Sequence, residues 1–211
     1  WDTSRRRLLN EGRATMYLNK DQQISLLKLA RSVIGARLRG QPQPVPDREK
    51  EFADALFSEK RGAFVTLHIQ GKLRGCIGYI VGMRDVPDTI MEMALASAFR
   101  DPRFPSLSSE ELGRIDIEIS VLTPIETVTD ISEIVIGRDG LIISDGRRTG
   151  LLLPQVAEEY QWDVHQFLEH TCFKAGLPGD AWKREGTKIE KFSAQVFGEK
   201  ELGLLDVSSN A

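Results

Sequence analysis

A short stretch in the first half of the chain, Leu73-Arg74-Gly75-Cys76-Ile77-Gly78, places a cysteine between two glycines. A cysteine can act as a nucleophile, a redox thiol or a metal ligand, although most cysteines pack as small buried residues. Glycine costs stability inside a strand and usually marks a bulge, or a place where a ligand or another backbone comes close. A reactive and a structural role are therefore both open for Cys76, with Gly75 and Gly78 as candidate substrate-binding positions.

Arg74 is the first candidate partner of this thiol. Side chains of a regular strand alternate between its two faces, so Arg74 and Cys76 are expected on the same face. A positive charge beside a cysteine favours the thiolate, which is the reactive form. The pair predicts a reactive thiol whose neighbouring arginine could also hold an anionic substrate.

His68 lies on the preceding predicted strand and is the obvious base for Cys76. A two-residue turn at Gly71-Lys72 would place His68 opposite Gly75. Cys76 would then lie opposite Leu67, on the other face of the sheet from His68. A Cys–His dyad is therefore not expected, unless a longer loop or a bulge at Gly75 shifts the register and reverses the faces.

Glu118 lies on the polar side of a strongly alternating predicted strand, residues 114–123, together with Asp116 and Ser120. An antiparallel sheet commonly leaves one face in water, so these side chains could simply be solvated. In the alternative interpretation, Glu118 lines a cleft with Cys76 and acts as a general base or as the partner of Arg100 or Arg103.

Arg100, Asp101 and Arg103 follow the end of a predicted helix. They could bind an anionic ligand, because arginine side chains recognise carboxylates and phosphates. They could equally pair with one another and with the last carbonyl groups of the helix. The sequence favours neither interpretation.

The other histidines and the second cysteine are weaker candidates. His165 and His170 are five residues apart, about 140° around a helix, so they do not form the i, i+4 pair of a helical metal site and are expected to be solvated. Cys172 lies on the apolar stripe of the same helix and is expected in the core. No CxxC pair, phosphate-binding loop or triad signature is present, and the sequence identifies neither a metal site nor a cofactor.

The elements that would position these residues follow from hydrophobic periodicity, turn residues and caps. Helices are expected over residues 20–39, capped by Asp21, and over 86–99, with further helices that begin at Asp47, Pro154 and Asp163. Strands are expected over residues 61–69, 73–81, 114–123, 141–143, 151–153 and 188–197. Strands that arrive as hairpins, with helices in separate blocks, predict an α+β fold with a mostly antiparallel sheet flanked by helices.

The length and composition limit the function classes. With 211 residues we expect an N-terminal tail at 1–19, a single domain at 20–200 with a large and a small lobe, and a C-terminal tail at 201–211. No apolar run approaches the roughly 20 residues of a membrane helix and no signal peptide is visible, so we expect a cytoplasmic protein outside the membrane. The 28 basic and 31 acidic side chains give a net charge of -3, which disfavours nucleic-acid binding and leaves it as a weak alternative.

Several motifs together resemble the AMMECR domain family, which occurs in archaea, bacteria and eukaryotes. The motifs are residues 71–78, 100–104, 117–122, 152–157, 162–163 and 174–177, and the resemblance extends over about residues 27–197. It implies a two-lobed α+β domain with a cleft proposed as an active site, and the family pattern includes Glu118. It also implies Memo-like and radical-SAM partners, beside which prokaryotic members are often encoded. Many members carry a His-Gly pair where this chain has Asp139-Gly140, so a role of that histidine cannot be transferred.

Two hypotheses about function follow. The first is a cytoplasmic enzyme or enzyme-associated domain that acts on an anionic small molecule or a modified macromolecule. Its catalytic residues would be Cys76 and Glu118, and its substrate-binding residues Arg74, Gly75, Gly78, Arg100, Asp101 and Arg103. The second is a non-enzymatic interaction module whose glycine-containing strand docks a Memo-like or radical-SAM protein.

Overall fold

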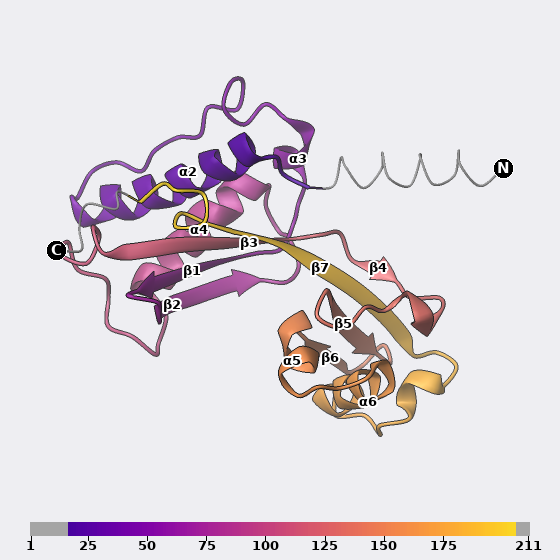
Figure 1. Ribbon diagram of the computed structural model, residues 1–211. Coiled ribbons are helices and arrows are strands. Elements are labelled where there is room, and N and C mark those ends of the chain that lie inside the picture. The colour runs from indigo at the N-terminus through magenta and orange to yellow at the C-terminus, as the bar shows by residue number, and fades with distance from the viewer. Residues whose placement is uncertain (1–16, 206–211) are drawn as a thin grey trace. The chain divides into compact units, whose positions relative to one another are not determined.

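The computed structural model describes residues 17–205, which form two compact units (Figure 1). Unit 1 contains the residues up to Leu122 and those from Gln195, and unit 2 is Thr123–Ala194. Each unit has its own cluster of buried apolar side chains. Most of the predicted tails, 1–19 and 201–211, lies outside the described residues, but Leu18 is buried and Leu202 packs against the core of unit 1.

Unit 1 is organised around a sheet with the strand order β2-β1-β3-β7. Its strands are β1 (Ala63–Ile69), β2 (Lys72–Tyr79), β3 (Ile115–Leu122) and the last part of β7 (Lys188–Gly198). β1 pairs antiparallel with both β2 and β3. Along β3, Ile115, Ile117 and Ile119 are buried, whereas the polar residues between them are half-buried. The sheet therefore has one apolar face and one polar face, as the alternation predicts.

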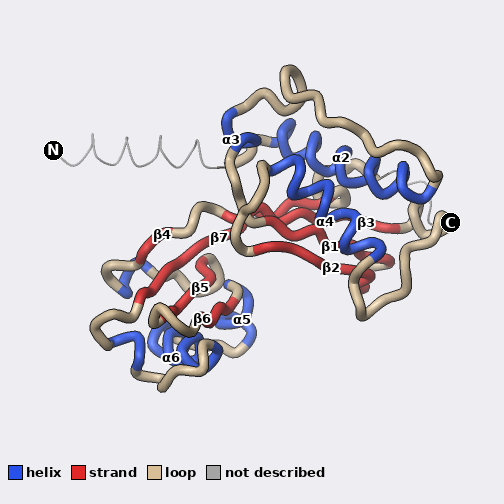
Figure 2. The backbone as a smooth tube through the Cα atoms, turned by 180° about the vertical axis from the view of Figure 1, so that it is seen from behind, coloured by secondary structure: helices blue, strands red, loops and turns tan. Residues whose placement is uncertain are grey.

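Helices cover the apolar face of this sheet (Figures 1 and 2). α4 (Val86–Phe99) packs on β1 and β2, and α2 (Lys20–Leu38) packs on α4 and β3. Small side chains such as Ala94 and Ala98 are buried in α4, which lets the helix approach the strands closely. The polar face lies on the side of the sheet away from these two helices.

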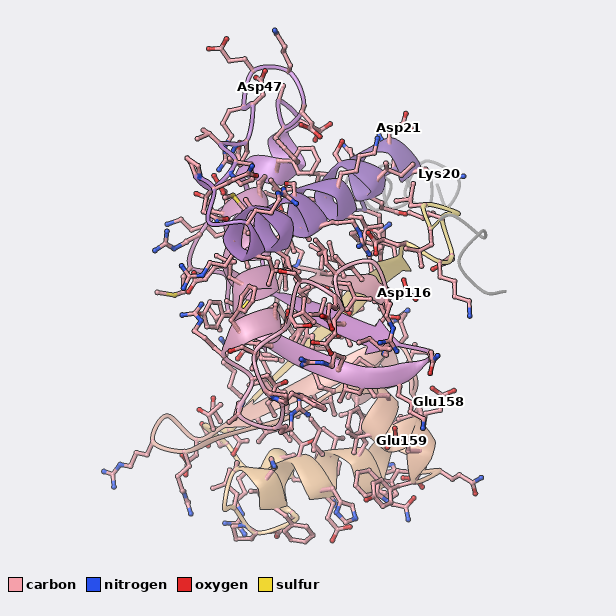
Figure 3. The ribbon with its side chains drawn as sticks, turned by 90° about the vertical axis from the view of Figure 1, so that its left-hand side faces the viewer. Lys20, Asp21, Asp47, Asp116, Glu158 and Glu159 are labelled. Carbon is pink, nitrogen blue, oxygen red and sulfur yellow. The ribbon has the colours of Figure 1, made fainter. Side chains whose placement is uncertain are left out.

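One predicted helix cap and one predicted helix start are wrong. Asn19, not Asp21, caps α2: its side chain accepts a hydrogen bond from the Gln22 backbone N–H, and the Gln22 side chain accepts one from the Asn19 N–H. The Asp47 carboxylate accepts bonds from the N–H groups two and three residues further on, but this turn does not continue as a helix. The short helix α3 (Ala55–Ser58) begins after Asp54 instead. Figure 3 shows Asp21 at the start of α2 and Asp47 on the following loop.

A buried carboxylate connects β3 to α2 and to the residues that follow β7. Glu199 is 3% exposed, accepts a hydrogen bond from the Ile117 N–H at 2.8 Å and forms an ion pair with Arg31 of α2. The Arg31 guanidinium also donates to the carbonyl oxygens of Leu112 and Ile115. These bonds hold β3, and with it Glu118, in a defined position in unit 1.

Unit 2 contains the rest of the seven-stranded sheet, which continues through β7. This part of the sheet consists of β5 (Asp139–Ser144), β6 (Thr149–Leu152), the first part of β7 and the short β4 (Glu126–Thr127). α6 (Val164–Lys174) packs on β5 and β6, α5 (Pro154–Glu159) packs on β5, and two 3-10 helices follow at η1 (Ile131–Glu133) and η2 (Ala181–Lys183). Cys172 on α6 is completely buried, which confirms its predicted place in the core.

The predicted α+β architecture with a mostly antiparallel sheet is confirmed. The sequence did not predict β4 or the two 3-10 helices, because elements of two or three residues are too short to show a period. Among residues 17–205, no helix is both long and apolar enough to cross a membrane.

Candidate functional site

The hairpin that carries Cys76 turns one residue earlier than predicted. Gln70 and Gly71 form the turn, with φ angles of 53° and 75°, and Ile69 pairs with Lys72. Two central residues at positive φ give the turn that best matches the right-handed twist of a hairpin. The predicted turn at Gly71-Lys72 is therefore wrong.

A β-bulge then shifts the register within the hairpin. Leu67 pairs with Gly75 and His68 pairs with Leu73, so that Arg74 is an extra residue in β2. The predicted pairing of His68 with Gly75 is therefore wrong as well. The bulge interrupts the alternation of β2 at Arg74. Alternation therefore no longer predicts that Arg74 and Cys76 lie on one face.

The bulge moves Cys76 to the polar face of the sheet. Cys76 pairs with Thr66, whose hydroxyl donates a hydrogen bond to the Cys76 Sγ at 3.2 Å. Without the extra residue, the observed turn would place Cys76 opposite Val65, which faces the core. His68 lies two residues after Thr66 and therefore on the same face. The structure therefore shows the alternative named for the hairpin, a bulge beside Gly75 that reverses the faces, and the expectation of opposite faces for His68 and Cys76 is wrong.

Thr66 also brings Glu118 into the same row. Thr66 pairs with Glu118 on β3, so Cys76, Thr66 and Glu118 follow one another across β2, β1 and β3. The next row on this face holds His68 and Asp116, which pair directly. All five side chains are half-buried. The structure thus places a thiol, a hydroxyl, an imidazole and two carboxylates on one face of unit 1.

Asp101 and Arg103 hold the backbone of Cys76 at the free edge of β2. The Asp101 carboxylate accepts a hydrogen bond from the Cys76 N–H at 2.9 Å, and the Arg103 guanidinium donates to the Cys76 carbonyl at 3.1 Å. The two side chains therefore replace a neighbouring strand at this residue. They also form an ion pair with each other at 2.7 Å, which is one of the two interpretations that the sequence left open.

Asp101 is ionised and almost completely buried. Its side chain is 1% exposed and accepts hydrogen bonds from the Arg103 backbone and guanidinium as well as from Cys76. The hydrogen bonds from the Arg103 side chain, together with those from the two backbone N–H groups, hold the pKa of Asp101 well below its usual range. Its direct role is therefore to position Cys76.

Arg74 forms a second ion pair beside the motif, with Glu111. Its guanidinium makes two hydrogen bonds to the Glu111 carboxylate, at 2.7 and 3.0 Å, which lower the pKa of Glu111 to about 2. The third nitrogen, Nη1, is the one buried side-chain nitrogen or oxygen among residues 17–205 without a hydrogen-bond partner. Arg74 and Arg103 both approach the ring of Phe104, with the guanidinium carbons 5.9 and 5.6 Å from its centroid. The two ion pairs and this ring thus form one cluster beside Cys76.

Gly75 and Gly78 both have an intramolecular reason to lack a side chain. A Cβ atom at Gly75 would lie 2.2 Å from the carbonyl oxygen of Ser97 in α4. A Cβ atom at Gly78 would lie 2.3 Å from the ring of Phe64, on the polar face. Close approach of another part of the chain therefore explains both glycines, and substrate binding by them stays a prediction.

Gly75→Ala is expected to lower the free energy of unfolding by about 1–3 kcal/mol, because α4 must move away from β2 to admit the methyl group. The matched control is Gly113→Ala, where a Cβ atom would meet nothing within 4 Å. Chemical denaturation of both variants measures the difference. Equal stability of the two variants would show that the contact between Gly75 and Ser97 is not tight.

Arg100 differs from the other two arginines of this region. It is exposed at the C-terminal end of α4 and has no hydrogen bond or ion pair from its side chain to any of residues 17–205. Tyr79 lies close enough for the charge of Arg100 to act on it, although a hydrogen bond to Glu92 dominates and raises the pKa of Tyr79. Arg100 is thus the arginine of this group with an uncompensated charge.

Two contributors to this site were missed in the sequence, Thr66 and Glu111. Thr66 and His68 are two residues apart on β1, so the sequence alternation already placed Thr66 on the polar face. Its contact with Cys76, however, depends on the bulge. Glu111 lies 37 residues from Arg74, and no sequence pattern connects the two.

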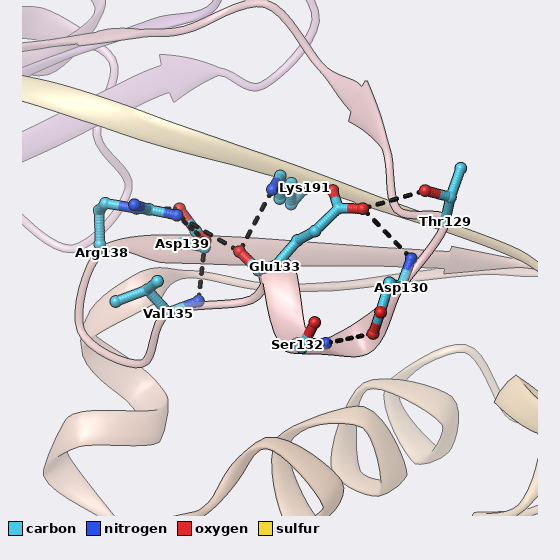
Figure 4. Close-up of polar contacts among 8 residues, drawn as sticks. All are labelled: Thr129, Asp130, Ser132, Glu133, Val135, Arg138, Asp139 and Lys191. Carbon is cyan, nitrogen blue, oxygen red and sulfur yellow. Dashed lines mark hydrogen bonds and ion pairs between the residues drawn. The ribbon is translucent and has the colours of Figure 1, made fainter. Parts of the chain in front are cut away.

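Asp139 in unit 2, where the resemblance would have a histidine, has a structural environment (Figure 4). Its carboxylate is 3% exposed and accepts hydrogen bonds from the Val135 N–H and from the guanidinium of Arg138. These bonds hold the turn that leads into β5. A second group of contacts in the same view joins Glu133 to Lys191 of β7.

Of the two histidines of α6, His165 is exposed as predicted, whereas His170 is half-buried. The His170 ring stacks on Trp162 at 3.9 Å between centroids, and Trp162 stacks in turn on Tyr160 at 5.0 Å. His165 lies 5.6 Å from the ring of Trp182. Within the described part of the chain, no group of three or more His, Cys, Asp or Glu residues is placed to hold a metal ion.

A family model, related sequences and a solved structure all match most of this chain. The family model of AMMECR1 matches residues 27–197. A protein of Methanothermobacter thermautotrophicus is 43% identical over 193 residues, which cover 86% of this chain and 96% of that protein. A protein of Methanocaldococcus jannaschii is 44% identical over 183 residues, covering 83% and 89%. The crystal structure of uncharacterized protein PH0010 from Pyrococcus horikoshii, 38% identical, superposes with a TM-score of 0.70 over 88% of this chain and 95% of that chain.

Proposed function

Because the chain belongs to the AMMECR1 family, whose compared members have names that state no activity, we propose its function from the Cys76 site. We propose a cytoplasmic enzyme or enzyme-associated domain in which Cys76 is the reactive thiol and an anionic small molecule or modified macromolecule is the substrate. One observation carries the proposal. The backbone of Cys76 is held at both its N–H and its carbonyl by the pair Asp101 and Arg103, while its side chain stays partly exposed on a polar face.

This arrangement suits a nucleophile, since a reactive atom must be held within a fraction of an ångström to be effective. A cysteine that only fills space in a core does not need a buried carboxylate and a partly exposed guanidinium to fix its peptide groups. The Thr66 hydroxyl adds a hydrogen bond to Sγ, and donors aimed at sulfur stabilise the negative charge of a thiolate.

The charged groups near Cys76 support an anionic substrate. Arg103 bonds the Cys76 carbonyl and half of its side chain is exposed, and Arg100, which precedes Asp101 in the chain, is exposed and has no hydrogen-bond or ion-pair partner among residues 17–205. The Nη1 of Arg74 is buried and has no acceptor, so it would be able to donate a hydrogen bond to a bound anion. Glu118, in the same row as Cys76, would act on the substrate as a general base.

The alternative function, docking of a Memo-like or radical-SAM protein on the glycine-containing strand, has less support. A partner strand would have to pair with the free edge of β2, but Asp101 and Arg103 already occupy the peptide groups of Cys76 there. Gly75 and Gly78 approach other parts of this chain, so neither is needed for a partner backbone.

Alkylation of the native protein with iodoacetamide tests the reactive thiol. We expect Cys76 to react at least about 100-fold faster than Cys172, because burial excludes the reagent from Cys172 and raises the pKa of its thiol. Peptide mapping by mass spectrometry gives both rates, and Cys172→Ala should leave the Cys76 rate unchanged. If Cys76 reacts only after the protein is unfolded, the proposal is wrong.

The same reaction tests the anionic substrate class. Inorganic phosphate and acetate at millimolar concentration are expected to slow the alkylation of Cys76, and Arg100→Gln should weaken this protection. Chloride at equal ionic strength is the control for screening. Protection that is identical in wild type and Arg100→Gln, or absent with both anions, would remove the arginine from the proposed site.

A further inference from the structure

We infer that His68 accepts the thiol proton of Cys76 and that Asp116 orients the His68 ring. The inference rests on the proposed function, since it concerns the same thiol. It depends on the observed register, in which the bulge at Arg74 turns Cys76 toward the face that carries His68. The three residues lie on three adjacent strands, β2, β1 and β3.

Strand geometry brings His68 within reach of Cys76. Cys76 pairs with Thr66, and the side-chain contact between them shows that both point to the polar face. His68 is the diagonal neighbour of Cys76, and such neighbours are roughly 7–8 Å apart between Cα atoms, which aromatic side chains can span. The imidazole has no hydrogen bond to any of residues 17–205 that would hold it elsewhere. Its ring nitrogens are therefore available.

Asp116 lies directly opposite His68 and would orient the ring through a hydrogen bond, which the structure does not contain between these two residues. The two residues pair directly across β1 and β3, and directly opposed residues have Cβ atoms about 4.5–5.5 Å apart. The Asp116 carboxylate is itself held by a hydrogen bond from the Lys200 N–H at 3.2 Å. A carboxylate that accepts the N–H of one ring nitrogen leaves the other nitrogen unprotonated and directed at a proton donor.

Two other ionisable residues lie near His68, and neither is a better acceptor for the thiol proton of Cys76. Glu118 is diagonal to His68 on β3, and Arg74 on β2 is bound to Glu111. Glu118 is separated from Cys76 by the whole width of β1, about 9–10 Å at the usual strand spacing. His68 is therefore the nearer acceptor for the thiol proton.

The proposed step is a proton transfer followed by nucleophilic attack. The S–H bond of Cys76 breaks, its proton moves to the free ring nitrogen of His68, and the electron pair stays on sulfur. The sulfur then forms a bond to an electrophilic carbon, and the leaving group departs with the electron pair of the broken bond. With iodoacetamide as the electrophile, iodide is the leaving group, so the step can be measured without the natural substrate.

The pH dependence of Cys76 alkylation tests this inference. At pH 6.5 we expect iodoacetamide to react with His68→Gln at least about tenfold more slowly than with wild type, because an ordinary thiol is almost fully protonated there. At about pH 9.5, where solvent removes the proton from an ordinary thiol, the difference should vanish. The matched control is His165→Gln in unit 2, which should react like wild type at every pH.

A second variant covers the case in which His68→Gln does not fold. Asp116→Asn keeps the imidazole but removes the orienting carboxylate, and it should slow the reaction at pH 6.5 by a smaller factor, with the same recovery at high pH. A slow reaction of Asp116→Asn at all pH values would indicate a merely structural role and overturn the inference.

The outcomes separate this inference from the proposed function. If wild-type Cys76 does not react in the native protein, the proposed function is wrong. If Cys76 reacts, but Glu118→Gln slows it at pH 6.5 while His68→Gln and Asp116→Asn do not, the proton goes to Glu118 and only the inference about His68 is wrong. A tenfold effect of His68→Gln that disappears at high pH supports both.

Discussion

Asp101→Asn is expected to lower the free energy of unfolding by about 3 kcal/mol, because two of its four hydrogen-bond donors would lose their acceptor. The carboxylate oxygens accept from the Cys76 N–H and from three N–H groups of Arg103. Asparagine offers one oxygen, and its amide group would face donors. Chemical denaturation at pH 7 measures the loss of stability.

The same substitution should expose the edge of β2. The Cys76 N–H donates its hydrogen bond to Asp101. Its exchange with solvent is therefore expected to become at least about tenfold faster in Asp101→Asn, the ratio that corresponds to a loss of about 1.4 kcal/mol in local opening free energy. Amide exchange by NMR or mass spectrometry detects this locally. Unchanged exchange at Cys76 would mean that the β2 edge is held without the carboxylate.

The stability difference should also depend on pH. The pKa of Asp101 is lowered in the folded protein, so its contribution is present above the ordinary aspartate pKa of about 3.9 and is lost as the pH falls through the folded value. Wild type and Asp101→Asn should therefore approach each other in stability below about pH 4. Asp21→Asn is the matched control, because Asp21 is exposed at the start of α2 (Figure 3). A difference that stays constant from pH 7 to pH 2 would contradict the role of the ionised carboxylate.

Much of the fold was predictable because its signals are local. α4 begins and ends at the predicted residues, since Asp85 caps it and the sequence after Phe99 contains prolines. β3 was predictable because isoleucine and polar residues alternate along it. The α2 cap was missed by two residues because Asn19 and Asp21 are both good caps, and only the bond to Gln22 decides between them.

The register of the Cys76 hairpin was not predictable, and this decided the composition of the site. A single extra residue reverses the face of Cys76; Gly75 marked a possible bulge at this place, but the sequence could not decide whether the bulge forms. The guanidinium of the bulged Arg74 is bound to Glu111, which lies 37 residues further along the chain. No local sequence pattern identifies Glu111 as the partner of Arg74. His68, which was not expected to reach Cys76, therefore lies on the same face of the sheet as the thiol.

Five of the eight predicted site residues separate into three kinds once their contacts are known. Asp101 and Arg103 hold the backbone of Cys76, as a pair, at the edge of β2. Glu118 and Cys76 share the polar face but are separated by Thr66. Arg100 is exposed and has no hydrogen-bond or ion-pair partner in residues 17–205. The types of residue suggested one substrate-binding role for Asp101, Arg103 and Arg100, whereas their contacts in the structure differ.

Glu111→Gln is expected to have the largest effect on stability, a loss of about 3–5 kcal/mol, because it leaves the buried Arg74 guanidinium without a counter-charge. Arg74 is 9% exposed, and one of its nitrogens already has no partner. The Glu111 carboxylate also accepts a hydrogen bond from the Ser108 N–H at 2.9 Å, which glutamine cannot keep together with both bonds to Arg74. Chemical denaturation at pH 7 measures the loss, and Glu110→Gln, at the exposed neighbouring residue, should stay within about 0.5 kcal/mol of wild type.

The loss should have a defined pH window. The pKa of Glu111 falls from 4.5 to about 2 on folding, so its ionised form stabilises the protein above about pH 4.5, and this contribution is lost as the pH falls from 4.5 toward 2. A shift of that size corresponds to about 3 kcal/mol, in agreement with the expected effect of the substitution. The stability of Glu111→Gln should therefore vary less than that of wild type between pH 4.5 and pH 2.

A double variant distinguishes loss of the ion pair from general damage to the loop. Arg74→Met combined with Glu111→Gln removes both charges, and replacing a buried pair by apolar groups costs much less than breaking it. The double variant should therefore be more stable than Glu111→Gln alone, by about 1–3 kcal/mol. If it is less stable than either single variant, the two residues act independently, and the bulge at Arg74 does not depend on Glu111. If stability is recovered while anions no longer protect Cys76 from alkylation, Arg74 contributes its charge to the site and not to the fold.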